Sequence, residues 1–349
     1  MSETIHNSIN EFVASRPREE ITGFATPLVP LKALSKHLDI ELWMKRDDLA
    51  GPSFGGNKSR QLEYYFGEAR AQDADTILIT GAIQSNFVRL AAACAVRFGM
   101  RPIVQLEQRV PKTDLIYNQS GNVLLNKLIG ADILYYPDGE DEAGADQALY
   151  DRASSLRKQG KRPYVIPLSE NKPPLGSLGY FRCAEEIASQ HKQSFDYVVV
   201  ASGSGATHLG LVAGMKYFSE HTKVIGSCVR RAANRQQHRL EEMSRLFNRF
   251  SGCPDYLVED DFWLWDKALA PGYGQIGPRG TEALKMMAQQ EGYILDPVYT
   301  AKSFAAVPGL LDEQYIRPGS RVLFVHTGGS AALFAYHDEM NKVIADSGE

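Results

Sequence analysis

Short apolar runs alternate with helix-like stretches along this chain, and this alternation constrains its fold more than any other feature. The apolar runs lie at residues 77–80, 102–106, 131–136, 163–167, 197–200, 224–226 and 322–326. Helix-like stretches lie at residues 59–70, 86–98, 122–128, 141–159 and 207–218. Continuous apolar strands separated by helices are typical of parallel sheets with both faces covered. The sequence therefore predicts an α/β fold.

The chain has 349 residues, a length that favours about two domains. A cluster of helix- and strand-breaking residues, Lys172 to Gly176, lies near its middle. We expect a smaller α/β domain of residues 60–165 and a larger domain formed by residues 1–59 and 166–349. A cleft between two such domains commonly binds a ligand.

Composition excludes several classes of protein. The net charge is 38 − 42 = −4 with no basic cluster, so we expect no nucleic-acid partner. No apolar run approaches the roughly 18 residues that span a bilayer, and the first twenty residues do not resemble a secretory signal, so we expect no membrane partner and a cytoplasmic location. The widely spaced Cys94, Cys183, Cys228 and Cys253 predict buried free thiols and no metal site.

The first motif that carries chemistry is the segment 53–60, SFGGNKSR. Its two glycines permit a tight turn, and a predicted helix follows, so Lys58 lies near a helix N-terminus. The positive end of the helix dipole lowers the pKa of an ammonium group, and imine formation needs a partly neutral lysine. The alternative is a solvated loop lysine, which is the common state of this residue type.

Two further motifs lie where a predicted strand meets a helix. In GAIQSNF (81–87), Ser85 or Asn86 either caps the helix or helps to bind an anion. In ASGSGATH (201–208), a glycine-rich turn offers backbone amides to a single phosphate. The turn lacks the Walker lysine and the third glycine of a dinucleotide site, and a tight turn without a ligand is the alternative.

Aromatic and hydroxyl side chains occupy three more loops. Tyr273 follows Ala-Pro-Gly, Tyr299 follows Asp-Pro-Val, and Thr327 ends the last apolar run. The tyrosines either pack in the core or direct their hydroxyls at a site. Thr327 lies where α/β sheets place ligands.

Together these motifs resemble the fold-type II enzymes that depend on pyridoxal 5′-phosphate (PLP), which are related to tryptophan synthase β. Within that class the chain is most similar to the D-cysteine desulfhydrase and 1-aminocyclopropane-1-carboxylate (ACC) deaminase family. The matching segments are KRDD (45–48), GGNK (55–58), GAIQSN (81–86), SGSGAT (202–207), APGYG (270–274), DPVY (296–299) and HTGG (326–329). The resemblance implies two three-layer α/β domains, with PLP in the cleft between them.

The resemblance also implies roles for individual residues. Lys58 would carry the cofactor and move the Cα proton, and Asn86 would bond the 3′ oxygen of the cofactor. The phosphate would be held by Gly203, Ser204, Gly205, Ala206 and Thr207. The small amino-acid substrate would contact Gln84, Ser85, Asn86 and Phe87, with Ser85, Tyr273 and Tyr299 joining Lys58 in catalysis. Thr327 would face the pyridine nitrogen.

Two threonines distinguish the subgroups of the family. ACC deaminases resemble DPVYE and HLGG, whereas this chain has Thr300 and Thr327 at these sites, as the desulfhydrases do. A hydroxyl supports a protonated ring less than a carboxylate does, so it favours β-elimination over opening of a cyclopropane. The resemblance implies conversion of D-cysteine to pyruvate, ammonia and sulfide by a homodimer. The alternatives are a cysteate sulfo-lyase or β-chloroalanine lyase, ACC deaminase, and a PLP-binding protein without turnover.

Three departures from the family pattern bear on the substrate. Phe87 replaces a common histidine, Gln61 replaces a common lysine near the phosphate, and residues 168–174 replace a shorter loop. An apolar ring makes an unpaired charge beside it costly. From Phe87 we therefore expect thiol or chloride to leave more readily than a sulfonate.

Overall fold

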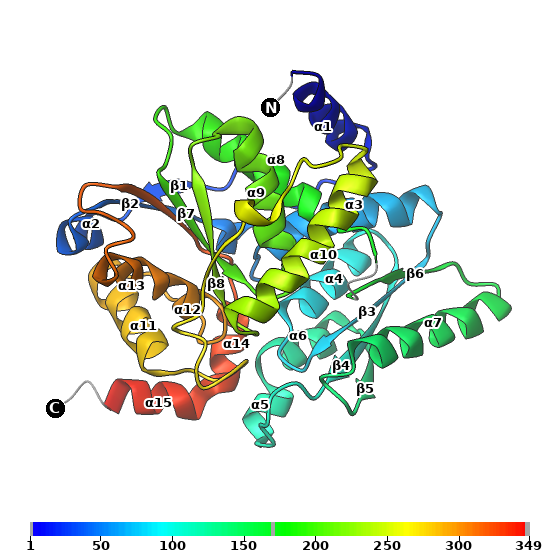
Figure 1. Cartoon of the computed structure of the whole chain (residues 1–349). Coiled ribbons are helices and arrows are strands. Elements are labelled where there is room, and N and C mark those ends of the chain that lie inside the picture. Colours follow the sequence, from blue (N-terminus) through cyan, green and yellow to red (C-terminus); the bar gives the residue numbers. More distant parts are fainter. Residues whose placement is uncertain (1–2, 169–171, 346–349) are drawn as a thin grey trace.

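The computed structural model describes residues 3–168 and 172–345, and their backbone forms two separate sheets (Figure 1). The six-stranded sheet has the order β1-β2-β10-β7-β8-β9, and the four-stranded sheet has the order β5-β4-β3-β6. All neighbouring strands run parallel except β1 and β2. The predicted α/β fold with parallel sheets is confirmed.

The strands of the larger sheet are β1 (Leu28–Pro30), β2 (Glu41–Lys45), β7 (Tyr197–Ser202), β8 (Lys223–Cys228), β9 (Trp263–Trp265) and β10 (Arg321–Val325). Those of the smaller sheet are β3 (Thr76–Ala82), β4 (Arg101–Glu107), β5 (Asp132–Tyr136) and β6 (Pro163–Ile166). All seven predicted apolar runs are strands. The smaller sheet thus comes from a continuous stretch of chain, as a domain at residues 60–165 requires, although its exact boundaries stay a prediction.

Helices cover both faces of each sheet. They are α1 (Glu3–Ser15), α2 (Lys32–Leu38), α3 (Lys58–Ala71), α4 (Asn86–Arg97), α5 (Leu115–Gln119), α6 (Gly121–Ile129), α7 (Glu142–Lys158), α8 (Ser177–Gln190), α9 (Ala206–Phe218), α10 (Ala233–Ser251), α11 (Pro278–Glu291), α12 (Thr300–Phe304), α13 (Ala306–Asp312), α14 (Ser330–Leu333) and α15 (His337–Ala345). Single 3-10 turns lie at η1 (Asp47–Leu49), η2 (Glu259–Asp261) and η3 (Phe334–Tyr336). The predicted helices correspond to α3, α4, α6, α7 and α9.

The two-residue repeat of a strand explains this layering. In β3, Ile77 and Ile79 join the core that contains α4, whereas Leu78 joins the cluster around Leu149 of α7. In β10, Leu323 likewise belongs to one core, whereas the residues directly before and after it belong to another. Each strand therefore presents apolar side chains to both faces, which is why these strands read as continuous apolar runs.

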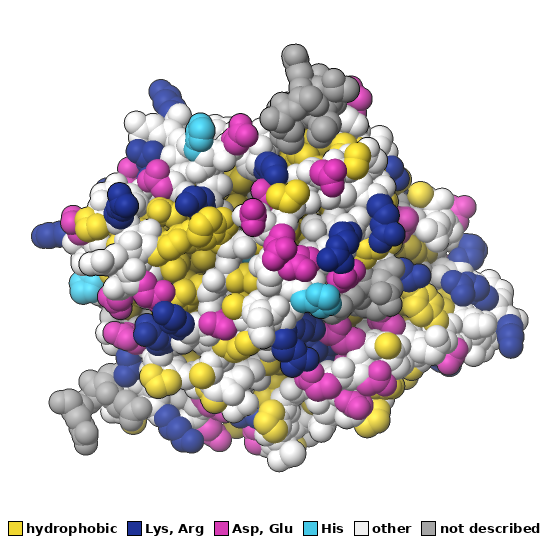
Figure 2. All heavy atoms as spheres, in the orientation of Figure 1, with side chains coloured by type: hydrophobic (Ala, Val, Ile, Leu, Met, Phe, Trp, Pro, Cys, Tyr) yellow, Lys and Arg dark blue, Asp and Glu magenta, His cyan; other side chains and the backbone are white. Residues whose placement is uncertain are grey.

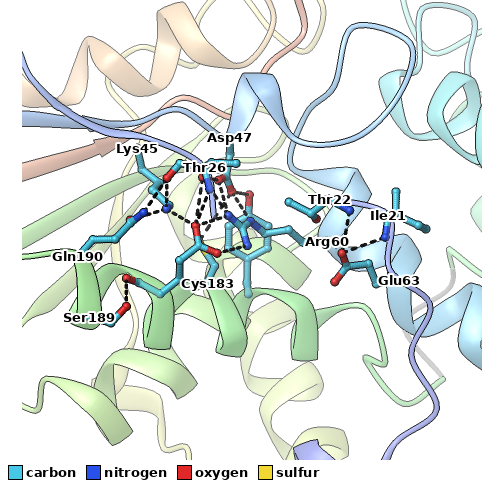
Figure 3. Close-up of polar contacts among 12 residues, drawn as sticks. Ile21, Thr22, Thr26, Lys45, Asp47, Arg60, Glu63, Cys183, Ser189 and Gln190 are labelled. Atoms are coloured by element: carbon cyan, nitrogen blue, oxygen red, sulfur yellow. Dashed lines mark hydrogen bonds and ion pairs between the residues drawn. The ribbon is translucent and has the colours of Figure 1, made fainter. Parts of the chain in front are cut away.

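A buried network of charged groups ties the start of α3 to β2, η1 and α8 (Figure 3). Arg60 donates to both oxygens of Asp47 at 2.9 Å and to both oxygens of Glu186 at 3.0 Å. Lys45 pairs with Glu186, and the hydroxyl of Tyr180 donates to Asp47 at 2.6 Å. Because every charge here has an opposite partner, burial of the group is tolerated. The network thus fixes the first turn of α3 at Arg60, two residues after Lys58.

Asp47→Asn is expected to lower the free energy of unfolding by about 3 kcal/mol, because it leaves Arg60 with a buried charge that is only partly compensated. Burial alone raises the pKa of Asp47, but Arg60 and Lys45 outweigh it and lower that pKa to about 2. Since this is below the value of the unfolded chain, the stabilisation is complete above pH 5 and is lost as pH falls toward 2. Urea unfolding at several pH values measures both effects. If the free energy of unfolding fell as steeply with decreasing pH in the variant as in the wild type, this role of Asp47 would be contradicted.

The cysteines, the helix lengths and the surface charges bear on the expectations drawn from composition. Cys94, Cys183, Cys228 and Cys253 are all buried and free, as predicted. Within the described ranges, no helix is both long and apolar enough to cross a membrane. Basic and acidic side chains are interspersed over the face shown in Figure 2.

Candidate active site

A cavity lies where the chain enters α3, α4 and α9 and leaves β10. It is lined by Asn57, Lys58, Ser85, Asn86, Phe87, Ala201, Gly203, Ser204, Gly205, Thr207, Tyr299, Thr327 and Gly328. Strands and helices meet here because the carboxyl ends of parallel strands share one edge of a sheet. The structure thus gathers most of the predicted site residues, from segments more than 200 residues apart, around one space.

Lys58 is the first residue of α3. The turn before it holds Gly55 at φ +58°, where an added Cβ would lie 2.3 Å from the carbonyl oxygen of Asp48. The amide of Asn57 donates to the carbonyl of Thr327 at 3.0 Å, which joins this turn to the end of β10. Only glycine tolerates this close approach, and the turn directs Lys58 into the cavity.

The amine of Lys58 has an apolar and neutral environment. It lies 3.5 Å from Oε1 of Gln61 and 5.2 Å from the centre of the Phe87 ring, and no described carboxylate pairs with it. Desolvation lowers its pKa from 10.5 to about 8. Near neutral pH a useful fraction of the amine is therefore unprotonated, as attack on a carbonyl carbon requires.

This pKa predicts how the apoprotein takes up pyridoxal phosphate. Only the neutral amine reacts, so the rate of covalent attachment should rise with pH and level off above a midpoint near 8. Stopped-flow absorbance of apoprotein mixed with the cofactor across pH 6–10.5 measures the rate. A rate that kept rising up to pH 10.5, as for an ordinary lysine, would contradict the predicted environment.

The glycine-rich turn opens α9 without a side-chain cap. Gly205 precedes the helix at φ +100°, and the first helical amides have no partners within the helix. Such uncapped amides at the positive end of the helix dipole bind phosphate. Gln61 supports the turn because its Nε2 donates to the hydroxyl of Thr207 at 2.7 Å. Ala206 borders a neighbouring hollow instead of the cavity itself.

Ser85 and Asn86 have different local partners. Ser85 caps α4 through a hydrogen bond from the amide of Val88 at 3.2 Å. The Oδ1 atom of Asn86 accepts from Nδ2 of Asn122 at 3.0 Å and from Arg89 at 3.4 Å. With its oxygen held in this way, Asn86 keeps its amide nitrogen as a donor for a ligand in the cavity.

Tyr273 and Tyr299 adjoin the same space. Their hydroxyls lie 2.5 Å apart, and both residues line a second hollow that adjoins the cavity and shares Lys58 and Ser85 with it. Lys302 supports the loop before Tyr273, since its amine donates to the carbonyls of Leu269 and Gly272 at 2.8 and 2.7 Å. Neither tyrosine is a remote core residue.

The structure places Gln84 differently from the prediction. Its Nε2 donates to the carbonyls of Tyr117 and Ser120 at 2.6 and 3.0 Å, and its Oε1 accepts from the amide of Asn122 at 2.9 Å. Its side chain thus serves to join α4 to the α5–α6 connection and does not line the cavity. Of the four residues predicted to contact the substrate in this turn, Ser85, Asn86 and Phe87 line the cavity.

The two threonines that distinguish the subgroups lie in different environments. Thr327 lines the cavity. Thr300 is fully buried, and its hydroxyl donates to Oδ1 of Asp296 at 2.7 Å, so it stabilises the start of α12 instead. Of the pair, only Thr327 can face a ligand.

Two residues that no motif in the sequence marks line the hollow that adjoins the cavity. Arg109 follows β4 and Arg230 follows β8, and both adjoin Ser85, Tyr273 and Tyr299. No motif marks either arginine, because each follows its strand in an unremarkable segment. Of the variant loop 168–174, Leu168 and residues 172–174 border the site, while residues 169–171 lie outside the described part of the chain.

These features define an enzyme of amine and carbonyl chemistry that uses a phosphorylated cofactor. An uncapped helix start for a phosphate, an amine of low pKa, an amide donor and a neutral hydroxyl all fit PLP. Residues 20–328 match the model of the family described as pyridoxal-phosphate dependent enzyme. The chain belongs to this family, and PLP is its cofactor.

Individual relatives cover almost the whole chain. A D-cysteine desulfhydrase of Yersinia pseudotuberculosis serotype O:1b (strain IP 31758) is 38% identical over 339 residues, which are 97% of this chain and 100% of the relative. A D-cysteine desulfhydrase of Serratia proteamaculans (strain 568) is 39% identical over 336 residues, covering 95% and 100%. The crystal structure of an ACC deaminase homologue superposes with a TM-score of 0.85 at 32% identity, covering 98% and 100%.

Proposed function

We propose that this protein eliminates the β-substituent of a small amino acid, and that it converts D-cysteine to pyruvate, ammonia and sulfide. The observation that carries the proposal is the position of Lys58, whose weakly basic amine shares one cavity with the uncapped start of α9 and the Ser85–Asn86 turn. The full-length similarity to two D-cysteine desulfhydrases supports the choice of substrate.

Each side chain has a distinct task in this proposal. Lys58 attaches the cofactor and moves the Cα proton, for which a pKa near 8 is well matched to neutral pH. The start of α4 at Ser85 receives the substrate carboxylate, and Asn86 donates to the 3′ oxygen of the cofactor. Tyr273 and Tyr299 flank the substrate. When bound, PLP supplies the electron sink that makes removal of the Cα proton feasible.

ACC deamination is the second candidate, supported by the likeness to the ACC deaminase homologue. Thr327 argues against it, since this side chain in the cavity is a neutral hydroxyl and Thr300 is occupied by Asp296. A neutral partner supports the electron sink less than a carboxylate does, and opening a carbon ring needs more support than expelling sulfur.

Product analysis separates the candidates. Purified holoenzyme is incubated with both enantiomers of cysteine, β-chloroalanine and cysteate, and with ACC. Pyruvate and sulfide from D-cysteine support the proposal, whereas a four-carbon keto acid from ACC supports the second candidate. Spectral evidence of bound cofactor with no keto acid from any compound would indicate a PLP-binding protein without turnover and would overturn the proposal.

We further propose a cytoplasmic homodimer. Four large apolar side chains that are 47–74% exposed support self-association: Leu115, Leu124, Leu128 and Phe334. They lie on α5, α6 and η3, which contact one another. Exposed apolar groups on adjoining elements are typical of an interface.

A further inference from the structure

The two arginines of the cavity have no part in the roles described so far. Arg109 and Arg230 follow strands of different sheets, yet both line the same space as Ser85, Tyr273 and Tyr299. Their side chains are only 7% and 10% exposed. Buried guanidinium groups require acceptors.

The guanidinium of Arg109 is held at one end only. Its Nε donates to the fully buried Glu107 at 2.6 Å, and its NH1 atom lies 3.9 Å from Glu142. Its NH2 atom is buried and has no hydrogen-bond partner among the described residues. Desolvation lowers the pKa of Arg109, but Glu107 outweighs it, so the net shift is upward and the group stays cationic. An unsatisfied buried cationic donor is costly unless a ligand supplies its acceptor.

Arg230 adds a second positive charge. It pairs with Glu142, and its guanidinium carbon lies 5.8 Å from the ring centre of Tyr273. The same glutamate is also within 3.5 Å of Arg231 and Arg239, so its single negative charge is shared by several guanidinium groups. This wall of the cavity therefore attracts anions.

We infer that Arg109, assisted by Arg230, binds the β-substituent of the substrate and the anion that it becomes on leaving. In the elimination the Cα proton is removed, a Cα–Cβ double bond forms and the Cβ–S bond breaks. Both electrons of that bond stay on sulfur, which departs as hydrosulfide. The guanidinium groups of Arg109 and Arg230, which line the space beside Ser85 and Tyr299, donate to this developing negative charge. The site accordingly selects amino acids whose β-substituent is an anion or leaves as one.

This inference changes an expectation drawn from Phe87. That residue also lines the cavity, but Arg109 and Arg230 line it too, so a sulfonate is not confined to an apolar wall. Under this inference Phe87 alone does not disfavour sulfonates, and the preference between thiol and sulfonate stays a prediction.

Equilibrium binding tests the subsite without turnover. Aspartate carries a carboxylate on Cβ that cannot leave, and alanine carries nothing there. In calorimetry with the wild-type holoenzyme, the preferred enantiomer of aspartate should bind at least about tenfold tighter than that of alanine, as one charge-assisted hydrogen bond allows. In Arg109→Gln the ratio of the aspartate affinity to the alanine affinity should fall to about 1. A wild type without the preference, or a variant that keeps it, would overturn the inference.

Two further variants guard against a folding artefact. Glu107→Gln/Arg109→Gln replaces the buried ion pair by two amides and should also lose the preference. Arg101→Gln is the matched control, since it removes an exposed arginine from β4, the strand that precedes Arg109, and should keep the preference.

Kinetics test the role of Arg109 in expelling the leaving group, which rests on the proposed function. Hydrosulfide is a much stronger base than chloride and needs more stabilisation as it leaves. Arg109→Gln should lower kcat/KM for D-cysteine about a hundredfold, the size seen for loss of an oxyanion donor, and that for β-chloro-D-alanine less than about threefold. Equal losses would overturn this role. If the wild type turns over neither compound, the proposed function fails, while the aspartate-to-alanine ratio still decides the subsite.

Discussion

Lys58→Ala is expected to abolish elimination, with kcat falling by about ten-thousandfold or more. The variant removes both the covalent attachment of the cofactor and the group that moves the Cα proton, and proton transfer alone contributes roughly 10²–10⁴. Keto-acid release measures the loss. Activity within about tenfold of the wild type would exclude Lys58 from the chemistry.

A chemical experiment tests the same assignment in the wild type. Borohydride reduces a carbon–nitrogen double bond between lysine and a carbonyl cofactor, which makes the attachment permanent. Peptide mass analysis should then locate the adduct at Lys58. Lys302 is the natural control, because desolvation also lowers its pKa to about 8, yet its amine is engaged by two backbone carbonyls. An adduct at Lys302 would show that a low pKa, and not position in the cavity, selects the lysine.

Gly205→Asp is expected to weaken PLP binding about a thousandfold. The substitution puts a carboxylate beside the amides that open α9, and repulsion of a buried like charge costs several kcal/mol. Equilibrium dialysis of the apoprotein against PLP measures the affinity. Binding that is unchanged would remove this turn from the site.

Strain must be separated from charge in this experiment. Gly205 has φ +100°, and an added Cβ would lie 2.7 Å from the sulfur of Met243, so any side chain disturbs the turn. Gly205→Ala carries the strain without the charge and should lose less affinity than Gly205→Asp. Ser204→Asp paired with Ser204→Ala introduces the charge at a position with ordinary backbone geometry. If the Asp variant bound PLP as tightly as the Ala variant at both positions, an anion-binding turn would be contradicted.

The parallel sheets were predictable because their strands are apolar on both faces and long enough to recognise. β1 and β9 were not, since each has only three residues, and β2 ends in Lys45, whose charge is satisfied by Glu186 from a distant helix. The pairing of β2 with β10 joins segments 280 residues apart (321 − 41), and nothing local in either strand encodes it.

The candidate site was predictable where one segment carries both the turn and the functional side chain, as at Lys58 and Gly205. The candidate site was not predictable where a side chain has several possible hydrogen-bond partners. Gln84 and Thr300 lie in motifs that imply ligand contact, but Gln84 is bonded to backbone carbonyls and an amide, and Thr300 is bonded to Asp296. Arg109 and Arg230 become neighbours only when the two sheets pack together, so spacing in the sequence cannot reveal them.

The four buried cysteines have a consequence for the chemical durability of the protein. Burial raises the pKa of Cys94 and of Cys228 to about 12, so almost no thiolate exists at either position near neutral pH. Thiolates are the species that react with disulfides, polysulfides and oxidants. Hydrosulfide itself does not react with a thiol, but the polysulfides formed when hydrosulfide is oxidised react with thiolates. A catalyst that releases hydrosulfide therefore keeps Cys94 and Cys228 in a form that resists such polysulfides, and persulfide formation at these two positions would require the core to open first.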